Sequence, residues 1–228
     1  MMKKISLLVI VLMQLLRVNA QSDSVYMFAY FKNNGQDGLH LAYSTDGFTW
    51  SALKQDSSFL KPTVAKDKLM RDPCIIRGAD GLFHMVWTVS WNDKGIGYAN
   101  SRDLINWSEQ QFIPVMKNEP TTVNVWAPEL FYDDEAKQYI IIWASCIPGR
   151  FERGIEEDSN NHRMYVTTTT DFKTFSDTKL FLDPKFSVID AVIVKRKKDD
   201  YVLVLKDNTR PERNIKVAFG SSPLGPWT

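Results

Sequence analysis

The stretch that decides the fold reads 72-DPCIIRGADGLFHMVWT-88, and its plan recurs twice further along the chain. It contains two apolar runs separated by the turn-forming residues 77–81, a pattern typical of a β-hairpin. An acidic residue followed by two apolar runs is present again at 129-ELFYDDEAKQYIIIWAS-145 and 190-DAVIVKRKKDDYVLVLKD-207. These three hairpins predict a sheet protein built from repeated units.

A second repeated pattern alternates with the hairpins. It consists of a strand, a Ser or Thr, a turn and a closing aromatic residue, and it occurs at 38-GLHLAYSTDGFTW-50, 95-GIGYANSRDLINW-107, 163-RMYVTTTTDFKTF-175 and 214-NIKVAFGSSPLGPW-227. Together the two patterns give units of about four short strands, which is the size of a β-propeller blade.

The number of units predicts the architecture. The unit at 25–50 has no acid-led strand before it, whereas the units 72–107, 129–175 and 190–227 read as complete. A propeller ring needs every blade finished, because an open strand edge pairs with other chains. We therefore expect an all-β protein, a five-bladed β-propeller with the last part of the ring missing from this chain. A four-bladed ring is the alternative, and it would still lack one strand.

Composition narrows the function classes. The 228 residues suffice for one domain, and 28 Lys and Arg against 27 Asp and Glu leave a net charge of +1. The sequence has no cluster of basic residues that would indicate a nucleic-acid partner. Aromatic residues make up 12% of the chain and include 7 Trp, which suits a surface that binds sugars. Cys74 and Cys146 lie in apolar runs, which favours two buried free thiols over a disulfide.

The N-terminal residues have the layout of a secretory signal peptide. Lys3 and Lys4 precede the short apolar stretch 5–16, and Ala20 offers a small residue for cleavage. The stretch is too short for a comfortable membrane span. We expect a signal peptide at 1–20, an incomplete propeller domain at 21–228, a secreted or periplasmic location and no membrane association after cleavage.

The acidic residues that open the hairpins are candidate site residues. Asp72, Glu129 and Asp190 are separated by 57 and 61 residues. In a propeller the first strand of each blade lines the central channel, so equivalent positions converge on its axis. Like charges held close raise one another's pKa values and destabilise the fold, which favours a functional role over strand capping. We expect the three carboxylates to occupy the same position in their blades and to face one funnel.

In order and spacing, Asp72-Pro73, 126-WAPE-129 and 189-IDA-191 resemble the blade-opening motifs of glycoside hydrolase family 43. The resemblance implies an inverting glycosidase on a five-bladed propeller, acting on arabinose or xylose residues of plant-type polysaccharides. It implies that Asp72 is the general base and that Asp190 orients the acid and tunes its pKa. The Glu-Gly-Pro motif that carries the general acid in this family does not occur in the sequence. We therefore expect impaired activity from this chain.

Five further side chains are candidates for substrate binding. The resemblance implies a binding-site carboxyl at Glu129, which is also the candidate for a substitute acid. Trp126 is expected either to stack on a sugar ring or to pack on its own blade, and Trp91 lies in a predicted rim loop at 89–95. Arg71 is expected to bond substrate hydroxyls or to neutralise the adjacent carboxylate. His162 is placed in the long loop 148–163.

No metal-binding spacing such as His-x-x-x-His or Cys-x-x-Cys occurs, so neither a catalytic metal nor another required cofactor is expected. Some members of the resembled family hold a calcium ion on the channel axis, and that site stays open here.

Two alternatives to this enzyme remain. One is a non-catalytic carbohydrate-binding propeller. The other is a retaining, fructan-cleaving glycosidase, because 71-RDP-73 resembles the Arg-Asp-Pro motif of that class. Those enzymes carry an Asn-Asp-Pro-Asn motif near the mature N-terminus, which 21-QSDSVYMF-28 lacks, so this alternative ranks lower.

Overall fold

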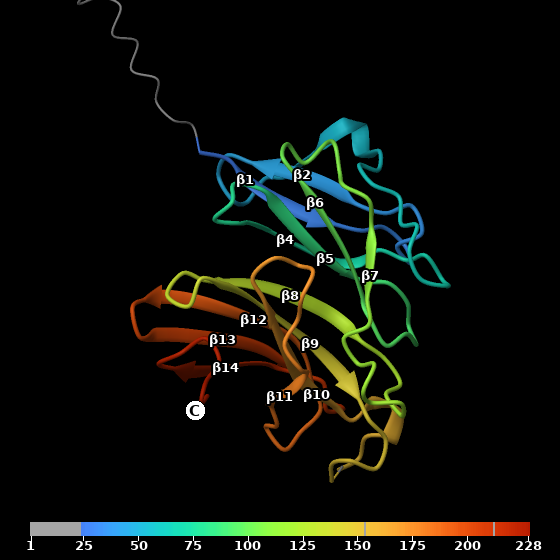
Figure 1. Ribbon diagram of the computed structural model, residues 1–228, viewed down its shortest axis with the longest axis vertical. Coiled ribbons are helices and arrows are strands. Elements are labelled where there is room, and N and C mark those ends of the chain that lie inside the picture. Colours follow the sequence, from blue (N-terminus) through green and yellow to red (C-terminus); the bar gives the residue numbers. More distant parts are fainter. Residues whose placement is uncertain (1–23, 153, 212) are drawn as a thin grey trace, which may run out of the picture.

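The computed structural model describes residues 24–152, 154–211 and 213–228 (Figure 1). The signal peptide expected at 1–20 lies outside them. Within the described residues no helix is long and apolar enough to cross a membrane. Helical structure in this part of the chain is confined to two short 3₁₀ turns, η1 (Leu53–Asp56) and η2 (Asp158–Asn160).

The described strands form four antiparallel sheets, one for each repeated unit (Figure 1). The first and fourth sheets have three strands and the two between them have four. In chain order the sheets comprise β1 (Tyr26–Tyr30), β2 (His40–Ser44) and β3 (Ser51–Ala52); β4 (Arg71–Arg77), β5 (Phe83–Thr88), β6 (Ile96–Ser101) and β7 (Gln111–Ile113); β8 (Trp126–Asp133), β9 (Gln138–Cys146), β10 (His162–Thr169) and β11 (Lys179–Leu182); β12 (Val188–Lys197), β13 (Asp200–Asp207) and β14 (Ile215–Gly220).

These sheets are consecutive blades of a β-propeller whose ring is not closed. Strands β4, β8 and β12 are the first strands of their blades, and β8 contacts both of the others. β1 pairs only with β2 and leads a sheet without an acid-led strand, as the sequence predicts for the first unit. The unit at 190–227 was expected to be complete, and this is wrong. After β14 the chain turns, and only Thr228 returns to pair with Phe219 through two backbone hydrogen bonds.

The turns that close each unit explain why the second sequence pattern repeats. A Ser or Thr hydroxyl accepts an N–H three residues on, while the Asp two residues later accepts two further N–H groups. The pairs that do this are Ser44 and Asp46, Ser101 and Asp103, and Thr169 and Asp171. The pattern therefore specifies the same local turn in three blades.

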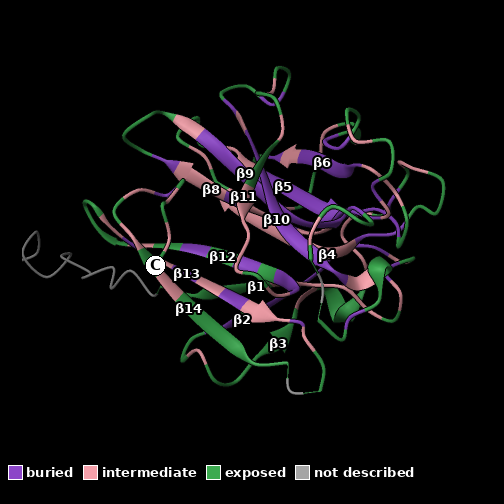
Figure 2. Cartoon of the chain, turned by 90° about the horizontal axis from the view of Figure 1, so that it is seen from below, coloured by how far each residue is buried: buried purple, intermediate pink, exposed green. Residues whose placement is uncertain are grey.

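The hydrophobic core lies between neighbouring blades. Trp87 of β5 and Trp143 of β9 are fully buried, and each packs in a cluster shared with the preceding sheet. The sheets at the two ends of the row are less buried than the two between them. β14 of the fourth sheet is exposed along most of its length, whereas β5 and β10 of the middle sheets are buried (Figure 2). Ile215, Val217 and Phe219 of β14 are each about half exposed or more. The blades thus bury one another, and the first and fourth blades each keep one apolar face uncovered.

Candidate active site

The first strands of three blades share one backbone irregularity. A residue with positive φ stands near the start of each: Asp72 at +49°, Ala127 at +45° and Asp190 at +54°. Such values are uncommon outside Gly, and Asp tolerates them better than most residues. Directly after this residue the pairing with the second strand shifts, as in a β-bulge. A bulge changes the direction in which side chains point. The first strands of these three blades therefore change direction at the same position.

This register corrects one sequence prediction. The ladder resumes at Cys74 in β4, at Glu129 in β8 and at Val192 in β12. Glu129 is therefore the equivalent of Cys74, not of Asp72, whose equivalent in β8 is Ala127. The expectation that three acids share one position is wrong by two residues. Alternation along a strand has a period of two, so a shift of two residues leaves the same face pattern and escapes detection.

The three bulges nevertheless line one cavity. Its volume is about 290 Å³, and three consecutive residues of each first strand contribute to it: Asp72, Pro73 and Cys74; Ala127, Pro128 and Glu129; Asp190, Ala191 and Val192. Asp72 and Asp190 stand at the first bulge position of their strands, whereas Glu129 stands two residues further along its own strand. The sequence prediction that these carboxyls face a common space thus holds, with a different depth for Glu129.

Asp72 is held by a hydroxyl from the neighbouring strand. The Oγ1 atom of Thr88 donates to Asp72 Oδ2 at 3.1 Å and accepts the N–H of Ala127 at 2.8 Å. Burial raises the pKa of Asp72 above its ordinary value. The Thr88 hydrogen bond and the charge of Arg71 oppose that rise. Asp72 is therefore a mostly buried carboxyl with one fixed hydrogen bond, which suits a base whose proton affinity is tuned.

Asp190 has a different environment. Its side chain is about half exposed, and its Oδ2 lies 3.4 Å from Nζ of Lys206 on β13. Both carboxyls line the cavity, and the negative charge of Asp190 also raises the pKa of Asp72. The arrangement places a mostly buried carboxyl and a half-exposed carboxyl at equivalent positions on two blades.

Glu129 is the most perturbed carboxyl of the cavity. Burial raises its pKa to about 7, and a hydrogen bond with the Cys74 thiol partly opposes the rise. Burial also raises the pKa of the Cys74 thiol, whose Sγ accepts the N–H of Leu130 at 3.3 Å. Both Cys74 and Cys146 are free, as predicted. With a pKa of about 7, Glu129 keeps its proton below neutral pH and is about half protonated at pH 7, a pKa range that suits a general acid.

Arg71 and Trp91 form the rim beside Asp72. The guanidinium of Arg71 lies 4.2 Å from the ring of Trp91 and 4.7 Å from the ring of Phe31. Asn34 Oδ1 accepts hydrogen bonds from Arg71 Nη1 at 3.0 Å and from Trp91 Nε1 at 2.9 Å. The first blade thus fixes the rim of the second. Sequence reasoning missed Asn34, because 33-NNG-35 signals only a turn.

Trp126 joins this rim from the third blade. Its Nε1 donates to the backbone oxygen of Trp91 at 2.9 Å, and the two indole rings meet edge to face at 5.6 Å. Trp91 is 44% exposed, so a ring face remains accessible. The structure therefore brings together Arg71, Trp91 and Trp126, which the sequence proposed separately.

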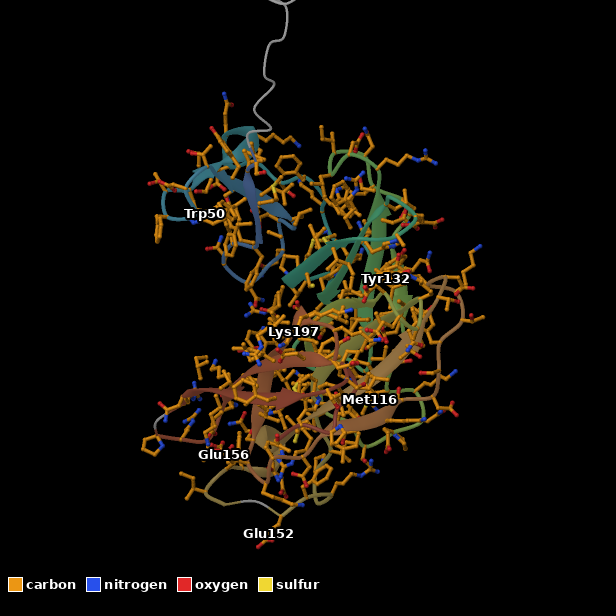
Figure 3. The ribbon with its side chains drawn as sticks, turned by 90° about the vertical axis from the view of Figure 1, so that its left-hand side faces the viewer. Trp50, Met116, Tyr132, Glu152, Glu156 and Lys197 are labelled. Atoms are coloured by element: carbon orange, nitrogen blue, oxygen red, sulfur yellow. The ribbon has the colours of Figure 1, made fainter. Side chains whose placement is uncertain are left out.

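His162 differs from its prediction. It was expected in a loop, but it begins strand β10 and is fully buried. Its ring stacks on Trp126 at 4.7 Å, and Asn124 Nδ2 lies 3.0 Å from its Nε2. Burial lowers its pKa to about 4, so the ring is neutral. His162 supports Trp126 from behind and has no open path to a sugar. Glu152 and Glu156, from the same expected loop, lie at the far end of the molecule (Figure 3).

Metal ions in proteins are held by groups of ligand side chains that lie close together. Among the described residues no group of three or more His, Cys, Asp or Glu side chains is arranged to hold a metal ion. The question of an axial calcium ion stays open.

Comparisons with known proteins agree with this geometry. A family model described as "Probable glycosyl hydrolase domain", in the group related to glycoside hydrolase family 43, matches residues 23–227. The chain is 21% identical over 199 residues to an α-L-arabinofuranosidase of Bifidobacterium longum subsp. longum. That alignment covers 76% of this chain and 19% of the relative, so the chain spans about a fifth of that protein's length.

Solved structures show the same fold. A family 43 β-1,3-galactosidase in complex with galactodeoxynojirimycin superposes with a TM-score of 0.62 at 14% identity, covering 90% of this chain and 72% of the other. An endo-arabinase from Bacteroides thetaiotaomicron superposes with a TM-score of 0.61 at 14% identity, covering 92% of this chain and 76% of the other. At such identities the likeness establishes the propeller and leaves the substrate open.

Proposed function

The chain belongs to the glycosyl hydrolase family related to glycoside hydrolase family 43, and we propose that it acts on O-glycosidic bonds of arabinose or xylose residues in plant-type polysaccharides or oligosaccharides. One observation carries the proposal: Asp72 and Asp190 occupy equivalent bulged positions on two blades and line one cavity. Residues 1–20 would direct the protein to the periplasm or outside the cell.

The chemistry follows from the two carboxyls. An inverting glycosidase uses one carboxylate to activate water and one carboxylic acid to protonate the leaving oxygen. We assign the base to Asp72, because Thr88 fixes its orientation and because its raised pKa strengthens it as a proton acceptor. Asp190 would orient the acid and tune its pKa. Arg71, Trp91 and Trp126 would hold the sugar at the rim.

The acid is the open part of this assignment. The family places it in a Glu-Gly-Pro motif that the 228 residues do not contain. Glu129 is the described carboxyl whose protonation suits the role, yet it stands two residues further along its strand than the position equivalent to Asp72 and Asp190. We therefore propose slow turnover by these 228 residues, with Glu129 as the source of whatever acid catalysis they show.

The test is a hydrolysis assay on 4-nitrophenyl α-L-arabinofuranoside and 4-nitrophenyl β-D-xyloside, followed by NMR of the first anomer released. Release of the inverted anomer supports the proposal. Release of the retained anomer would replace it with the fructan-cleaving type of chemistry, in which Asp72 stabilises the transition state.

A second candidate is a non-catalytic carbohydrate-binding propeller, and the partly exposed ring of Trp91 beside Arg71 and Trp126 favours it. Calorimetric titration with arabino- and xylo-oligosaccharides separates the two. Binding without any release of 4-nitrophenol identifies a binder, whereas turnover identifies an enzyme.

A further inference from the structure

A lysine stands directly behind the bulge of the fourth blade. Lys206 of β13 pairs with Ile189, the last residue of β12 before the register shift. Its Nζ lies 3.4 Å from Oδ2 of Asp190, and its side chain is about two-thirds buried. The backbone pairing fixes the Cα of Lys206 beside the carboxyl, so the ion pair does not depend on a mobile loop.

The rest of the strand makes this lysine unusual. In 201-YVLVLKD-207 the residues Val202 and Val204 share the alternation of Lys206, and both are apolar. Lys206 is the next residue on that face, near the end of β13, and places a positive charge beside the cavity-lining Asp190. Ion pairs on exposed surfaces usually contribute little to the free energy of unfolding, so stability alone gives weak reason for this lysine.

The same ammonium acts on Asp72. Three charged groups shift the pKa of Asp72: Arg71 from its own strand, and Asp190 and Lys206 from the fourth blade. Asp190 disfavours the ionised form of Asp72, while Arg71 and Lys206 favour it. Lys206 is thus the ion-pair partner of Asp190, and its charge also favours the ionised form of Asp72.

We propose that Lys206 is a positioning residue of the site: its ammonium holds the Asp190 carboxylate at the cavity and offsets the repulsion between Asp190 and Asp72. This role rests on the proposed function, since it serves two carboxyls that must work close together. Without the cation, the two negative charges would face each other across the cavity with only Arg71 to compensate.

The decisive experiment does not need turnover. The side-chain carboxyls of Asp are labelled with ¹³C, and their titration is followed by NMR in the wild type and in Lys206→Met, which keeps the side-chain length and removes the charge. We expect the titration midpoint of Asp72 to move to higher pH in Lys206→Met. Lys206→Arg should restore most of the wild-type midpoint.

A matched control comes from the same sheet. Lys216 of β14 pairs with Asp207 at 2.8 Å, so Lys216→Met also removes a lysine and one ion pair from the fourth blade. It should leave the Asp72 midpoint unchanged. An Asp72 midpoint that is the same in Lys206→Met, Lys216→Met and the wild type would overturn the proposal.

Kinetic measurements distinguish a failure of the positioning role of Lys206 from a failure of the proposed hydrolase activity. In a hydrolytically active protein, Lys206→Met should lower kcat by roughly tenfold and leave KM within about a factor of two, because the loss falls on the chemistry. A loss confined to KM would overturn the positioning role and make Lys206 a substrate contact. A shifted Asp72 midpoint in a protein without turnover supports Lys206 and counts against the hydrolase.

Discussion

Thr88 connects Asp72 to the next blade through a single hydroxyl. Its Oγ1 donates to the Asp72 carboxylate at 3.1 Å and accepts the backbone N–H of Ala127 at 2.8 Å. Ala127 is the position in β8 equivalent to Asp72 in β4. The hydroxyl therefore has its proton directed at the carboxylate, because its acceptor side is already occupied by the N–H.

Thr88→Val should remove both bonds at almost constant volume. We expect the free energy of unfolding to fall by about 1–3 kcal/mol, since the partly buried Ala127 N–H is left without its acceptor. The pKa of Asp72 should rise, because the hydrogen bond that opposes burial is lost. Urea unfolding and NMR titration measure the two effects. Thr88→Ser keeps the hydroxyl and serves as the control; if it behaves like Thr88→Val, the hydroxyl is not responsible.

Glu129→Gln should stabilise the protein at alkaline pH. The folded state raises the pKa of Glu129 from 4.5 to about 7, so the folded state binds the proton more tightly than the unfolded state. Its contribution to stability is complete below pH 4.5 and is lost as the pH rises through about 7. Gln does not titrate, so the variant should gain about 2 kcal/mol relative to wild type between pH 5 and pH 8. Equal pH dependence in the two proteins would contradict the buried, protonated Glu129.

The same variant tests the acid. If Glu129 protonates the leaving oxygen, Glu129→Gln should abolish cleavage of unactivated arabino-oligosaccharides and spare aryl glycosides with a good leaving group. Glu135→Gln, an exposed change in the β8–β9 turn, is the matched control. Loss of both substrates to the same degree would assign Glu129 to binding.

His162 should make the protein less stable in acid. Burial lowers its pKa from 6.5 to about 4, so the unfolded state takes up the proton first as the pH falls. Its contribution is complete above pH 6.5 and declines toward pH 4. His162→Gln retains an acceptor for Asn124 and does not titrate. Between pH 7 and pH 4.5 the free energy of unfolding of the wild type should therefore fall by about 2 kcal/mol more than that of His162→Gln. His84, whose pKa burial also lowers, stays in both proteins and cancels in the comparison.

The blades could be predicted because their signals are local. Period-two alternation and the Ser/Thr-x-Asp turns of 44–50, 101–107 and 169–175 act within a few residues, so the sequence shows them directly. Thr88, Asn34 and Lys206 could not be found this way, because each acts on a residue from another strand or blade. The depth of Glu129 depends on a bulge, and no residue type marks a bulge in an alternating run.

Asp72→Asn is the sharpest test of the catalytic assignment. Asn tolerates positive φ as well as Asp does, so the backbone at +49° and the following Pro73 should be undisturbed. Asn also keeps a side-chain oxygen that accepts the Thr88 hydroxyl, and only the base is lost. We expect kcat for aryl arabinofuranosides to fall by about 10²–10⁴-fold with KM nearly unchanged.

Two comparisons make the Asp72→Asn result interpretable. Asp134→Asn changes an exposed carboxyl in the β8–β9 turn and should leave kcat at the wild-type value. Azide added to Asp72→Asn should restore product from a substrate with a good leaving group, because the anion replaces activated water. If Asp72 only capped the start of β4, Asn would cap it nearly as well. A near-wild-type kcat in Asp72→Asn would therefore remove the base from this site and leave the sugar-binding propeller as the better account.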